Sequence, residues 1–366
     1  MTCASAWRVR DCLTRPPAQA GTSAPTAHSW TAYSATGQST FDWREQEALL
    51  NGFPQYVVTL DGIKLHYLHV PAKNGTGRPL LLSHGWPGSI FEFMELIPRL
   101  TDPEKYGGSP EDAFLVVAPS LPGYGLSYAP GQRFVPVGEI SDIFIQLMRD
   151  VLGYQKFAAQ GGDIGAWVTT LLGAHHPDKV VGVHLNMLWH GVDPDHQPSP
   201  SNDAERAFLD HLKKWRRYDG AYGHMHGTPP LTLAYGLTDS PAGLAAWIVE
   251  KFRAWSDCGG NVESVFTLDQ LLADITLYWM TGAIFTSFAP YHDEIHNISV
   301  IDRPVTVPTA YIEFPHEIVK PPRSFAEKRY ANIQRWTTSD RGGHFAAMEQ
   351  PDLMAQDIRE FFRDRL

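Results

Sequence analysis

Cysteine, basic residues and long apolar runs are all scarce in this chain of 366 residues, and each scarcity excludes a class of protein. The three cysteines, Cys3, Cys12 and Cys258, are an odd and sparse set that argues against a disulfide framework. Lys and Arg number 30 against 40 Asp and Glu, without a basic run, so we expect no nucleic-acid partner. No apolar stretch approaches the roughly 20 residues of a membrane span, so we expect no membrane anchor and a cytoplasmic location. No spacing of His, Cys and Asp is typical of a metal site, and we expect neither a metal nor another cofactor.

Aromatic and aliphatic residues, by contrast, are plentiful enough for one large core. Hydrophobic residues make up 43% of the chain, which suits a single large α/β domain carrying an insertion. Residues 1–40 differ from the rest, because they are rich in Ala, Ser, Thr and Pro and lack a regular apolar period. They contain no apolar segment of the kind that a secretory signal needs, and we expect them to form a flexible tail.

Short apolar runs alternate with helical patterns through most of the remaining chain. Apolar residues spaced by three and four between 140 and 152 predict a helix that Gly153 ends. Asp42 and Glu45 predict a capping box at the start of an earlier helix. The alternation of strand and helix predicts an α/β fold with an open, mostly parallel central sheet. The expected strands lie at 55–60, 64–70, 79–83, 114–118, 156–160, 180–186, 305–314 and 335–338, and a last helix lies at 352–362.

Between residues 189 and 301 the strand pattern stops and helical patterns take over. Thr267 and Gln270 predict a capping box at the start of one helix. A helical insertion late in an α/β sheet predicts a lid over the carboxyl ends of the strands, which would divide the core into residues 41–188 and 302–366. Another expected helix has an apolar face made of Leu244, Trp247, Ile248, Phe252 and Trp255.

The segment Gly161-Gly162-Asp163-Ile164-Gly165 follows an expected strand and precedes a helical pattern. Small residues two before and two after Asp163 permit a sharp strand-to-helix turn that aims its side chain at a pocket. A carboxylate that attacked an acyl carbon would give a mixed anhydride, whereas attack on a saturated carbon gives an ordinary ester that water can cleave. We therefore expect Asp163 to attack an epoxide or an alkyl halide rather than an ester or a peptide.

A nucleophile of this kind needs a base, a carboxylate that orients the base, and donors for negative charge. His344 follows the last expected strand after two glycines that allow a tight turn, and it is the expected base. The orienting carboxylate is Glu317 or Glu313, and the turn position of Glu317 favours it. The backbone N–H groups of the loop after 79–83, that of Trp86 among them, and of Ile164 would form the oxyanion hole.

Six motifs between residue 41 and the C-terminus are specific only in combination. They are FDWR at 41–44, HGWPGS at 84–89, GGDIG at 161–165, DSPAGLAAW at 239–247, VPT at 307–309 and RGGHFAA at 341–347. Together they resemble the epoxide hydrolases of the α/β-hydrolase fold, in the branch related to the microsomal enzymes. The resemblance implies that Asp163 is the nucleophile, His344 the base and Glu317 its acid partner. It also implies that two lid tyrosines, Tyr222 and Tyr291, protonate the opening epoxide oxygen.

The same resemblance implies a small-molecule epoxide as substrate, no cofactor, and a homodimer as the expected assembly. The chain departs from the family in two places. The family's N-terminal segment, which normally wraps the core, is expected to be shortened or replaced before Phe41, and we expect no membrane anchor there. The lid loop at 226–230 has Pro229 where a Lys commonly precedes the second proline, close in sequence to Tyr222.

Two other functions are alternatives at this point. A haloalkane-type dehalogenase shares the Asp nucleophile and the His base, but it needs N–H donors for the departing halide. Such a donor is often an indole directly after the nucleophile, where this chain has Ile164. A non-catalytic ligand-binding protein on the same fold would not need Asp163, Glu317 and His344 together.

Overall fold

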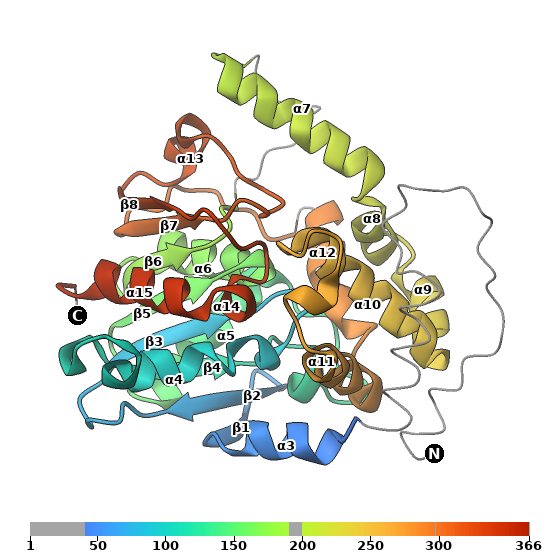
Figure 1. The fold of residues 1–366 in the computed structure, drawn as a ribbon, viewed down its shortest axis with the longest axis horizontal. Coiled ribbons are helices and arrows are strands. Elements are labelled where there is room, and N and C mark those ends of the chain that lie inside the picture. The colour runs from blue at the N-terminus through green and yellow to red at the C-terminus, as the bar shows by residue number, and fades with distance from the viewer. Residues whose placement is uncertain (1–40, 190–199, 297, 366) are drawn as a thin grey trace.

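The computed structural model describes residues 41–189, 200–296 and 298–365, and the flexible tail predicted for residues 1–40 lies outside them. At its centre is an eight-stranded sheet with the strand order β1-β2-β4-β3-β5-β6-β7-β8 (Figure 1). β2 pairs antiparallel with β1 and with β4, and all other neighbouring strands are parallel. The mostly parallel sheet predicted from the sequence is confirmed. The strands are β1 (Gln55–Leu60), β2 (Ile63–Val70), β3 (Arg78–Ser83), β4 (Phe114–Pro119), β5 (Phe157–Gly161), β6 (Val180–Leu185), β7 (Thr309–Glu313) and β8 (Ile333–Thr338).

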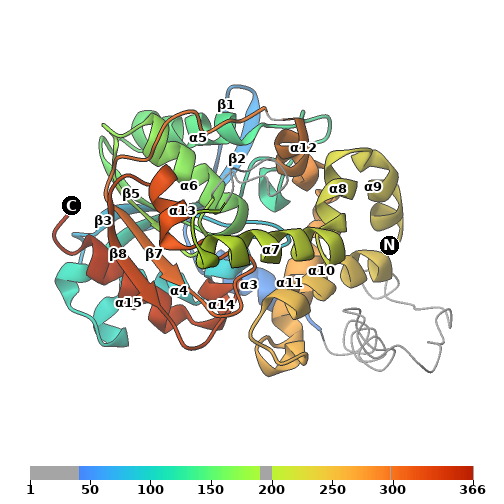
Figure 2. The same cartoon turned by 90° about the horizontal axis from the view of Figure 1, so that it is seen from above.

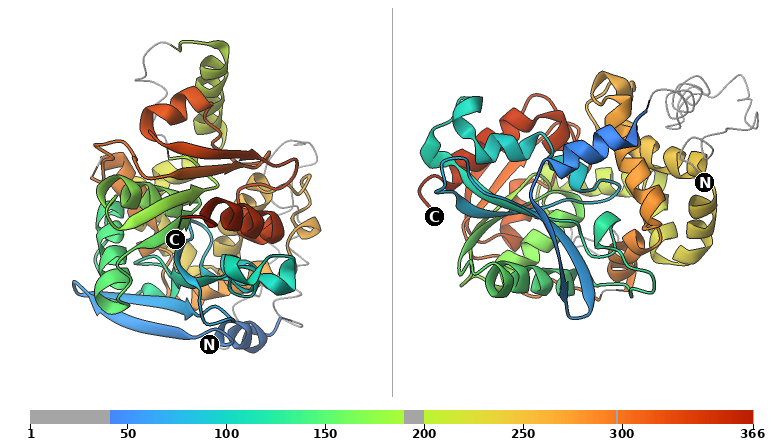
Figure 3. Two further views of the ribbon diagram at one scale, coloured as in Figure 1. Left: turned by 90° about the vertical axis from the view of Figure 1, so that its left-hand side faces the viewer. Right: turned by 90° about the horizontal axis from the view of Figure 1, so that it is seen from below.

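Helices cover both faces of this sheet. α5 and α6 lie on one face and α4 and α15 on the other (Figure 2), while the β1–β2 hairpin and β8 lie at opposite edges (Figure 3). Successive side chains of β3 belong to different cores, because Leu81 packs with α5 and α6 whereas Leu80 and Leu82 pack with α4 and α15. Burial on both faces explains why these strands are continuous apolar runs in the sequence. The helices are α4 (Leu96–Thr101), α5 (Val137–Gln146), α6 (Asp163–His175) and α15 (Pro351–Phe362), and α3 (Trp43–Asn51), α13 (Arg323–Arg329) and α14 (Ala346–Glu349) complete the core.

The described part of the predicted lid, between β6 and β7, forms helices without a strand and lies beside the sheet in Figure 1. The predicted capping box of Thr267 and Gln270 begins α11 and is confirmed, and the apolar face predicted between 244 and 255 lies in α10. No single helix of the described residues is long and apolar enough to span a membrane, although Leu268–Thr281 and Thr286–His296, bent by 108°, meet the criterion as a pair on length and composition. The lid helices are α7 (Asp203–Tyr218), α8 (Ala221–Gly227), α9 (Pro230–Asp239), α10 (Pro241–Trp255), α11 (Leu268–Thr281) and α12 (Ala289–His296).

The strand predicted at 305–314 is shorter in the structure, where β7 begins only at Thr309. Pro304 and Pro308 have no N–H to donate to a neighbouring strand, so the segment before Thr309 cannot pair continuously. Val305 keeps an isolated bridge to Tyr330. The predicted length of the strand is therefore wrong, because the apolar pattern continues through two prolines that cannot donate to a neighbouring strand.

Two predicted helix ends also differ from the structure. Asp42 is the N-cap of α3 as predicted, and its carboxylate accepts the N–H of Arg44 at 2.8 Å. The capping box with Glu45 is wrong, because the N–H of Glu45 binds the backbone oxygen of Asp42. The helix predicted at 140–152 changes character at Gln146, where α5 ends and a π-helical turn, Leu147–Val151, follows.

Candidate active site

Asp163 lies at a sharp turn between β5 and α6 and is the first residue of the helix. Its φ is +49°, in the left-handed region that a residue with a side chain rarely adopts, and such strain is concentrated at functional turns. A Cβ on Gly161 would lie 2.1 Å from the carbonyl oxygen of Gly165, and a Cβ on Gly165 would lie 2.0 Å from that of Ser83. Glycine at these two positions therefore allows the turn that projects the Asp163 side chain beyond the end of β5.

The loop after β3 lies directly against the Asp163 carboxylate. The N–H of Trp86 donates to Asp163 Oδ1 at 2.7 Å, and a Cβ on Gly85 would lie 2.3 Å from the same oxygen. His84 is buried in this loop, where its Nε2 accepts a backbone N–H at 3.1 Å and burial lowers its pKa to about 4. His84 is therefore neutral at pH 7 and braces the loop. Ile164, in the first turn of α6, lines the same cavity as Asp163.

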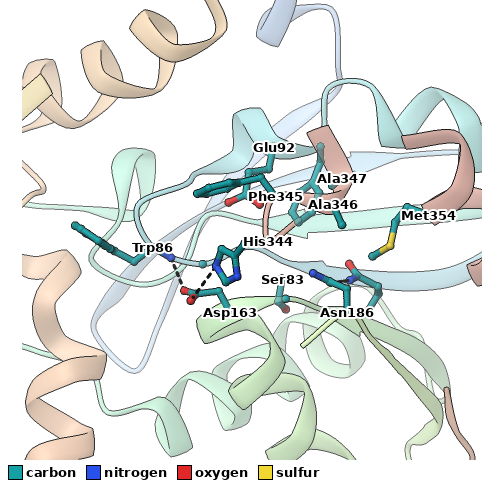
Figure 4. Close-up of a pocket in the computed structure, with 14 residues that line it drawn as sticks. Ser83, Trp86, Glu92, Asp163, Asn186, His344, Phe345, Ala346, Ala347 and Met354 are labelled. Atoms are coloured by element: carbon teal, nitrogen blue, oxygen red, sulfur yellow. Dashed lines mark hydrogen bonds and ion pairs between the residues drawn. The ribbon is translucent and has the colours of Figure 1, made fainter. Parts of the chain in front are cut away.

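His344 follows β8 and lies between two carboxylates. Its Nδ1 is 2.8 Å from Glu317 Oε1. Its Nε2 is 3.3 Å from Asp163 Oδ2 (Figure 4). The backbone N–H of His344 donates to the carbonyl of Trp255 at 2.9 Å, which ties this loop to the lid. Burial alone would lower the pKa of His344, but the charges of Glu317 and Asp163 raise it well above its ordinary value. The imidazole is consequently protonated in the free site.

The structure brings Glu317, and not Glu313, to His344. Glu317 lies in the turn after β7, is 3% exposed, and accepts the N–H of Ile318 at 2.7 Å with the oxygen that also faces His344. Glu313 is the last residue of β7 and is half-buried, and burial raises its pKa. In the part of the chain that the structure describes, no ion pair or side-chain hydrogen bond joins Glu313 to His344.

Tyr222 of α8 and Tyr291 of α12 come together on the lid side of the site. Their ring centroids are 5.5 Å apart, and Trp86 stacks on Tyr222 at 5.2 Å and meets Tyr291 edge-on at 5.9 Å. Both tyrosines are buried and line one cavity with Asp163. Burial, followed by neighbouring groups that include the Asp163 carboxylate, raises the pKa of each phenol well above its usual range. The Tyr291 hydroxyl makes no hydrogen bond of regular geometry within the described residues. Its neighbour Tyr222 nevertheless raises its pKa.

The cavity shared by Asp163 and the two tyrosines has a volume of about 530 Å³. It lies between the ends of β5 and β6 and the lid, and its size is in the range of pockets that hold drug-sized ligands. Trp167 and Trp189 stack 4.4 Å apart in its wall. Other apolar residues of the wall include Met187, Leu188, Leu212, Ile295, Ile301 and Val319.

A further carboxylate near the site was not predicted from the sequence. Glu92, one turn after the HGWPGS motif, lines a space of about 20 Å³ with Asp163, Asn186 and His344 (Figure 4), enough for about one water molecule. Burial, and then the Asp274 carboxylate, raises the pKa of Glu92 to about 8. In the sequence, only the position of Glu92 shortly after the HGWPGS motif indicates that it lies near the site. No group of three or more His, Cys, Asp or Glu among the described residues is arranged to hold a metal ion.

Family models match most of the chain between residues 7 and 247. Residues 7–93 match the model described as the epoxide hydrolase N terminus, and residues 78–247 match the model of the alpha/beta hydrolase fold. The first match begins well before Phe41. Similarity to the family therefore extends into a segment in which the motifs alone indicated a shortened or replaced sequence.

Individual relatives are similar over nearly the whole chain. A putative epoxide hydrolase from Stigmatella aurantiaca is 43% identical over 88% of this chain and 73% of its own, and epoxide hydrolase 1 from Oryctolagus cuniculus is 36% identical over 88% and 76%. Among solved structures, juvenile hormone epoxide hydrolase from the silkworm Bombyx mori has a TM-score of 0.86 at 29% identity and covers 98% of this chain and 90% of that one. The epoxide hydrolase of Aspergillus niger has a TM-score of 0.84 at 29% identity and covers 100% and 93%. The chain belongs to the epoxide hydrolases of the α/β-hydrolase fold.

Proposed function

We propose that this epoxide hydrolase forms a covalent ester on Asp163, which water activated by His344 then cleaves to release a vicinal diol. The observation that carries this proposal is the unequal environment of the two Asp163 oxygens. Oδ1 accepts the N–H of Trp86 at 2.7 Å, whereas Oδ2 lies 3.3 Å from His344 Nε2. Oδ2 is therefore the attacking oxygen, and Oδ1 becomes the carbonyl oxygen of the ester.

In the first step, Asp163 Oδ2 attacks an epoxide carbon and the C–O bond of the ring breaks. The electron pair of that bond moves to the epoxide oxygen, which takes a proton from Tyr222 or Tyr291. An alkoxide is far more basic than a phenolate, so the transfer is downhill once the ring opens. Both phenols are protonated at neutral pH, since burial raises the pKa of each above its usual range, and each therefore holds a proton that it can give to the stronger base.

In the second step, His344 takes a proton from water as the water oxygen attacks Cγ of Asp163. Negative charge then develops on Oδ1, where the N–H of Trp86, and in this proposal that of Ile164, stabilise it. Collapse of the intermediate releases the diol and restores the carboxylate. Glu317 stabilises the imidazolium of His344. Once the ester has formed, the proton that His344 holds in the free site passes to the tyrosine that lost one, so the neutral imidazole can take the proton of water and is protonated again when the ester is cleaved. The overall reaction therefore consumes only epoxide and water.

No observation favours either of the two alternative functions. A halide leaves as a stable anion and needs no proton, so a dehalogenase has no use for two protonated phenols in the cavity of its nucleophile. The side chain of Ile164 offers no donor to a halide. A binding protein would not need the strained turn at Asp163, whose φ is +49°.

The cavity supports a bulky, largely apolar epoxide as the substrate. Its volume of about 530 Å³ is much larger than a small epoxide requires, and the Trp167–Trp189 stack provides a flat apolar wall. One relative, from the silkworm, is named a juvenile hormone epoxide hydrolase. The homodimer implied by the family resemblance is part of this proposal, and sedimentation of the purified chain tests it.

A single turnover in oxygen-18 water tests the covalent mechanism. With enzyme in excess over styrene oxide, the diol of the first turnover should be unlabelled, because its new oxygen comes from Asp163. Label should enter the enzyme and reach the diol only in later turnovers. Label in the first diol would mean direct attack by water, and Asp163 would not be the nucleophile.

A further inference from the structure

Lys251 of α10 is a buried charge in the lid that the two chemical steps do not use. The residue is 5% exposed, and its ammonium lies 4.7 Å from the centroid of the Tyr222 ring and 5.5 Å from that of Trp255. Burying a charged group is unfavourable unless other groups compensate it. A lysine buried against one of the proposed proton donors therefore calls for an explanation.

Two carboxylates hold the Lys251 ammonium in this position. Its Nζ lies 3.2 Å from Asp219 Oδ1 and 2.8 Å from Glu250 Oε2. Asp219 lies in the short connection between α7 and α8, and its other oxygen accepts the indole N–H of Trp255 at 3.1 Å. Trp255 also accepts the backbone N–H of His344. The ammonium is thus fixed within a cluster that joins the lid to the loop of the base.

The ring of Tyr222 becomes negatively charged when its hydroxyl gives up a proton. A cation on the face of that ring interacts more strongly with a phenolate than with a neutral phenol, so it lowers the barrier to proton transfer. The carboxylates of Asp163, Glu294 and Asp219 act in the opposite direction on Tyr222. Glu250, which pairs with the ammonium at 2.8 Å, also offsets part of its charge. Lys251 is a cation in direct contact with the ring.

We propose that Lys251 is a positioning residue for ring opening, whose ammonium, held by Asp219 and Glu250, stabilises the phenolate that forms as Tyr222 protonates the epoxide oxygen. This inference rests on the proposed role of Tyr222. The bond between Asp163 Oδ2 and the substrate carbon forms as the C–O bond of the ring breaks, and the proton passes from the Tyr222 hydroxyl to the epoxide oxygen. Lys251 forms and breaks no bond in this step.

A double-mutant cycle with Tyr222 tests the proposal, with the single-turnover rate of ester formation on styrene oxide as the readout. Lys251→Met should slow ester formation about five- to thirtyfold in the wild-type background, as expected for a desolvated cation over an aromatic ring. It should have little further effect on Tyr222→Phe, because no phenolate forms at that position. Lys251→Arg should retain most of the rate, since it keeps the charge.

Lys214→Met is the matched control, because Lys214 is an exposed lysine of the same lid and its loss should leave the rate unchanged. Equal slowing by Lys251→Met in both backgrounds would indicate a purely structural role and would overturn the proposal. If Tyr222→Phe alone leaves ester formation at the wild-type rate, the role of Tyr222 in the proposed function is wrong. The two failures are therefore distinguishable.

Substrate electronics provide a second measurement. An epoxide with a trifluoromethyl substituent opens to a less basic alkoxide and depends less on proton donation, so Lys251→Met should slow it less than it slows styrene oxide. An equal effect on both substrates would contradict the proposal. If the Met variant unfolds at a lower temperature than wild type, Lys251→Gln removes the charge, retains a donor to Asp219, and takes its place in the same comparisons.

Discussion

His344 is the residue whose charge must change during the proposed reaction, and its surroundings provide for that change. In the free site, the carboxylates of Glu317 and Asp163 both raise its pKa. Formation of the ester removes the charge of Asp163, so one of these two contributions disappears and the pKa of His344 falls. The imidazole becomes a better base at the stage when water must be activated.

Replacement of His344 separates the two halves of the reaction. We expect His344→Gln to form the ester with Asp163 but to cleave it very slowly, because no base remains to take the proton of water. Intact-protein mass spectrometry after addition of styrene oxide should then detect protein heavier by the mass of the epoxide. Asp163→Asn is the control and should gain no mass. A His344→Gln variant that turned over without accumulating ester would show that another group is the base.

The two glutamates near β7 allow a matched comparison. Glu317→Gln removes the charge that stabilises the His344 imidazolium at 2.8 Å, and we expect it to slow cleavage of the ester within the range of about 10²–10⁴-fold that general-base catalysis contributes. Glu313→Gln makes the same chemical change four residues away and should have little effect. A larger loss in Glu313→Gln than in Glu317→Gln would mean that the acid partner has been assigned to the wrong residue.

At the scale of secondary-structure elements, the site combines a turn of the core with two helices of the lid. Tyr222 and Tyr291 come from α8 and α12, which pack against each other. We expect each single change to Phe to slow ester formation, and the double change nearly to abolish it, because either phenol can partly replace the other. The pre-steady-state rate on an epoxide measures this effect. If the double variant forms the ester at the wild-type rate, neither tyrosine donates a proton and both serve only in packing.

The parts of the site that could be predicted from sequence are those with a local physical signature. Asp163 is marked by the glycines that its turn requires, and His344 by the glycines that precede it. Glu317 and Glu313 could not be separated with certainty, because the choice depends on where β7 ends and how the following turn folds. Local sequence also left Tyr222, Tyr291, Glu92 and Lys251 unmarked, because their positions result from packing between distant elements. The two tyrosines were identified only through resemblance to the family.

The same limit applies to the elements themselves. The sheet could be predicted because buried parallel strands require apolar runs of a characteristic length. The capping box at Thr267 was correct because both partners lie within one turn. The strand predicted at 305–314 is too long, because apolar character alone does not give continuous pairing where Pro304 and Pro308 lack an N–H group.

At the scale of the whole molecule, His344 connects core and lid, so its protonation should affect the stability of the fold. It lies between Asp163 after β5 and Glu317 after β7, and its backbone binds Trp255 of α10. Folding raises the pKa of His344 well above its ordinary value of 6.5. Each unit of such a rise corresponds to about 1.4 kcal/mol of stabilisation while the folded protein alone holds the proton.

The direction of the resulting pH dependence follows from the sign of that shift. For a group whose pKa is raised by folding, the stabilisation is complete below the unfolded pKa and is lost as the pH rises through the folded pKa. The free energy of unfolding of wild type relative to His344→Gln should therefore be largest near and below about pH 6.5, and it should shrink as the solution becomes alkaline. Urea unfolding of both proteins over this range measures the difference. In an Asp163→Asn background, where one of the two carboxylates is neutral, the loss should begin at lower pH. A difference that instead grows with pH would mean that folding lowers the pKa of His344. The inference that the imidazole is protonated in the free site would then be wrong.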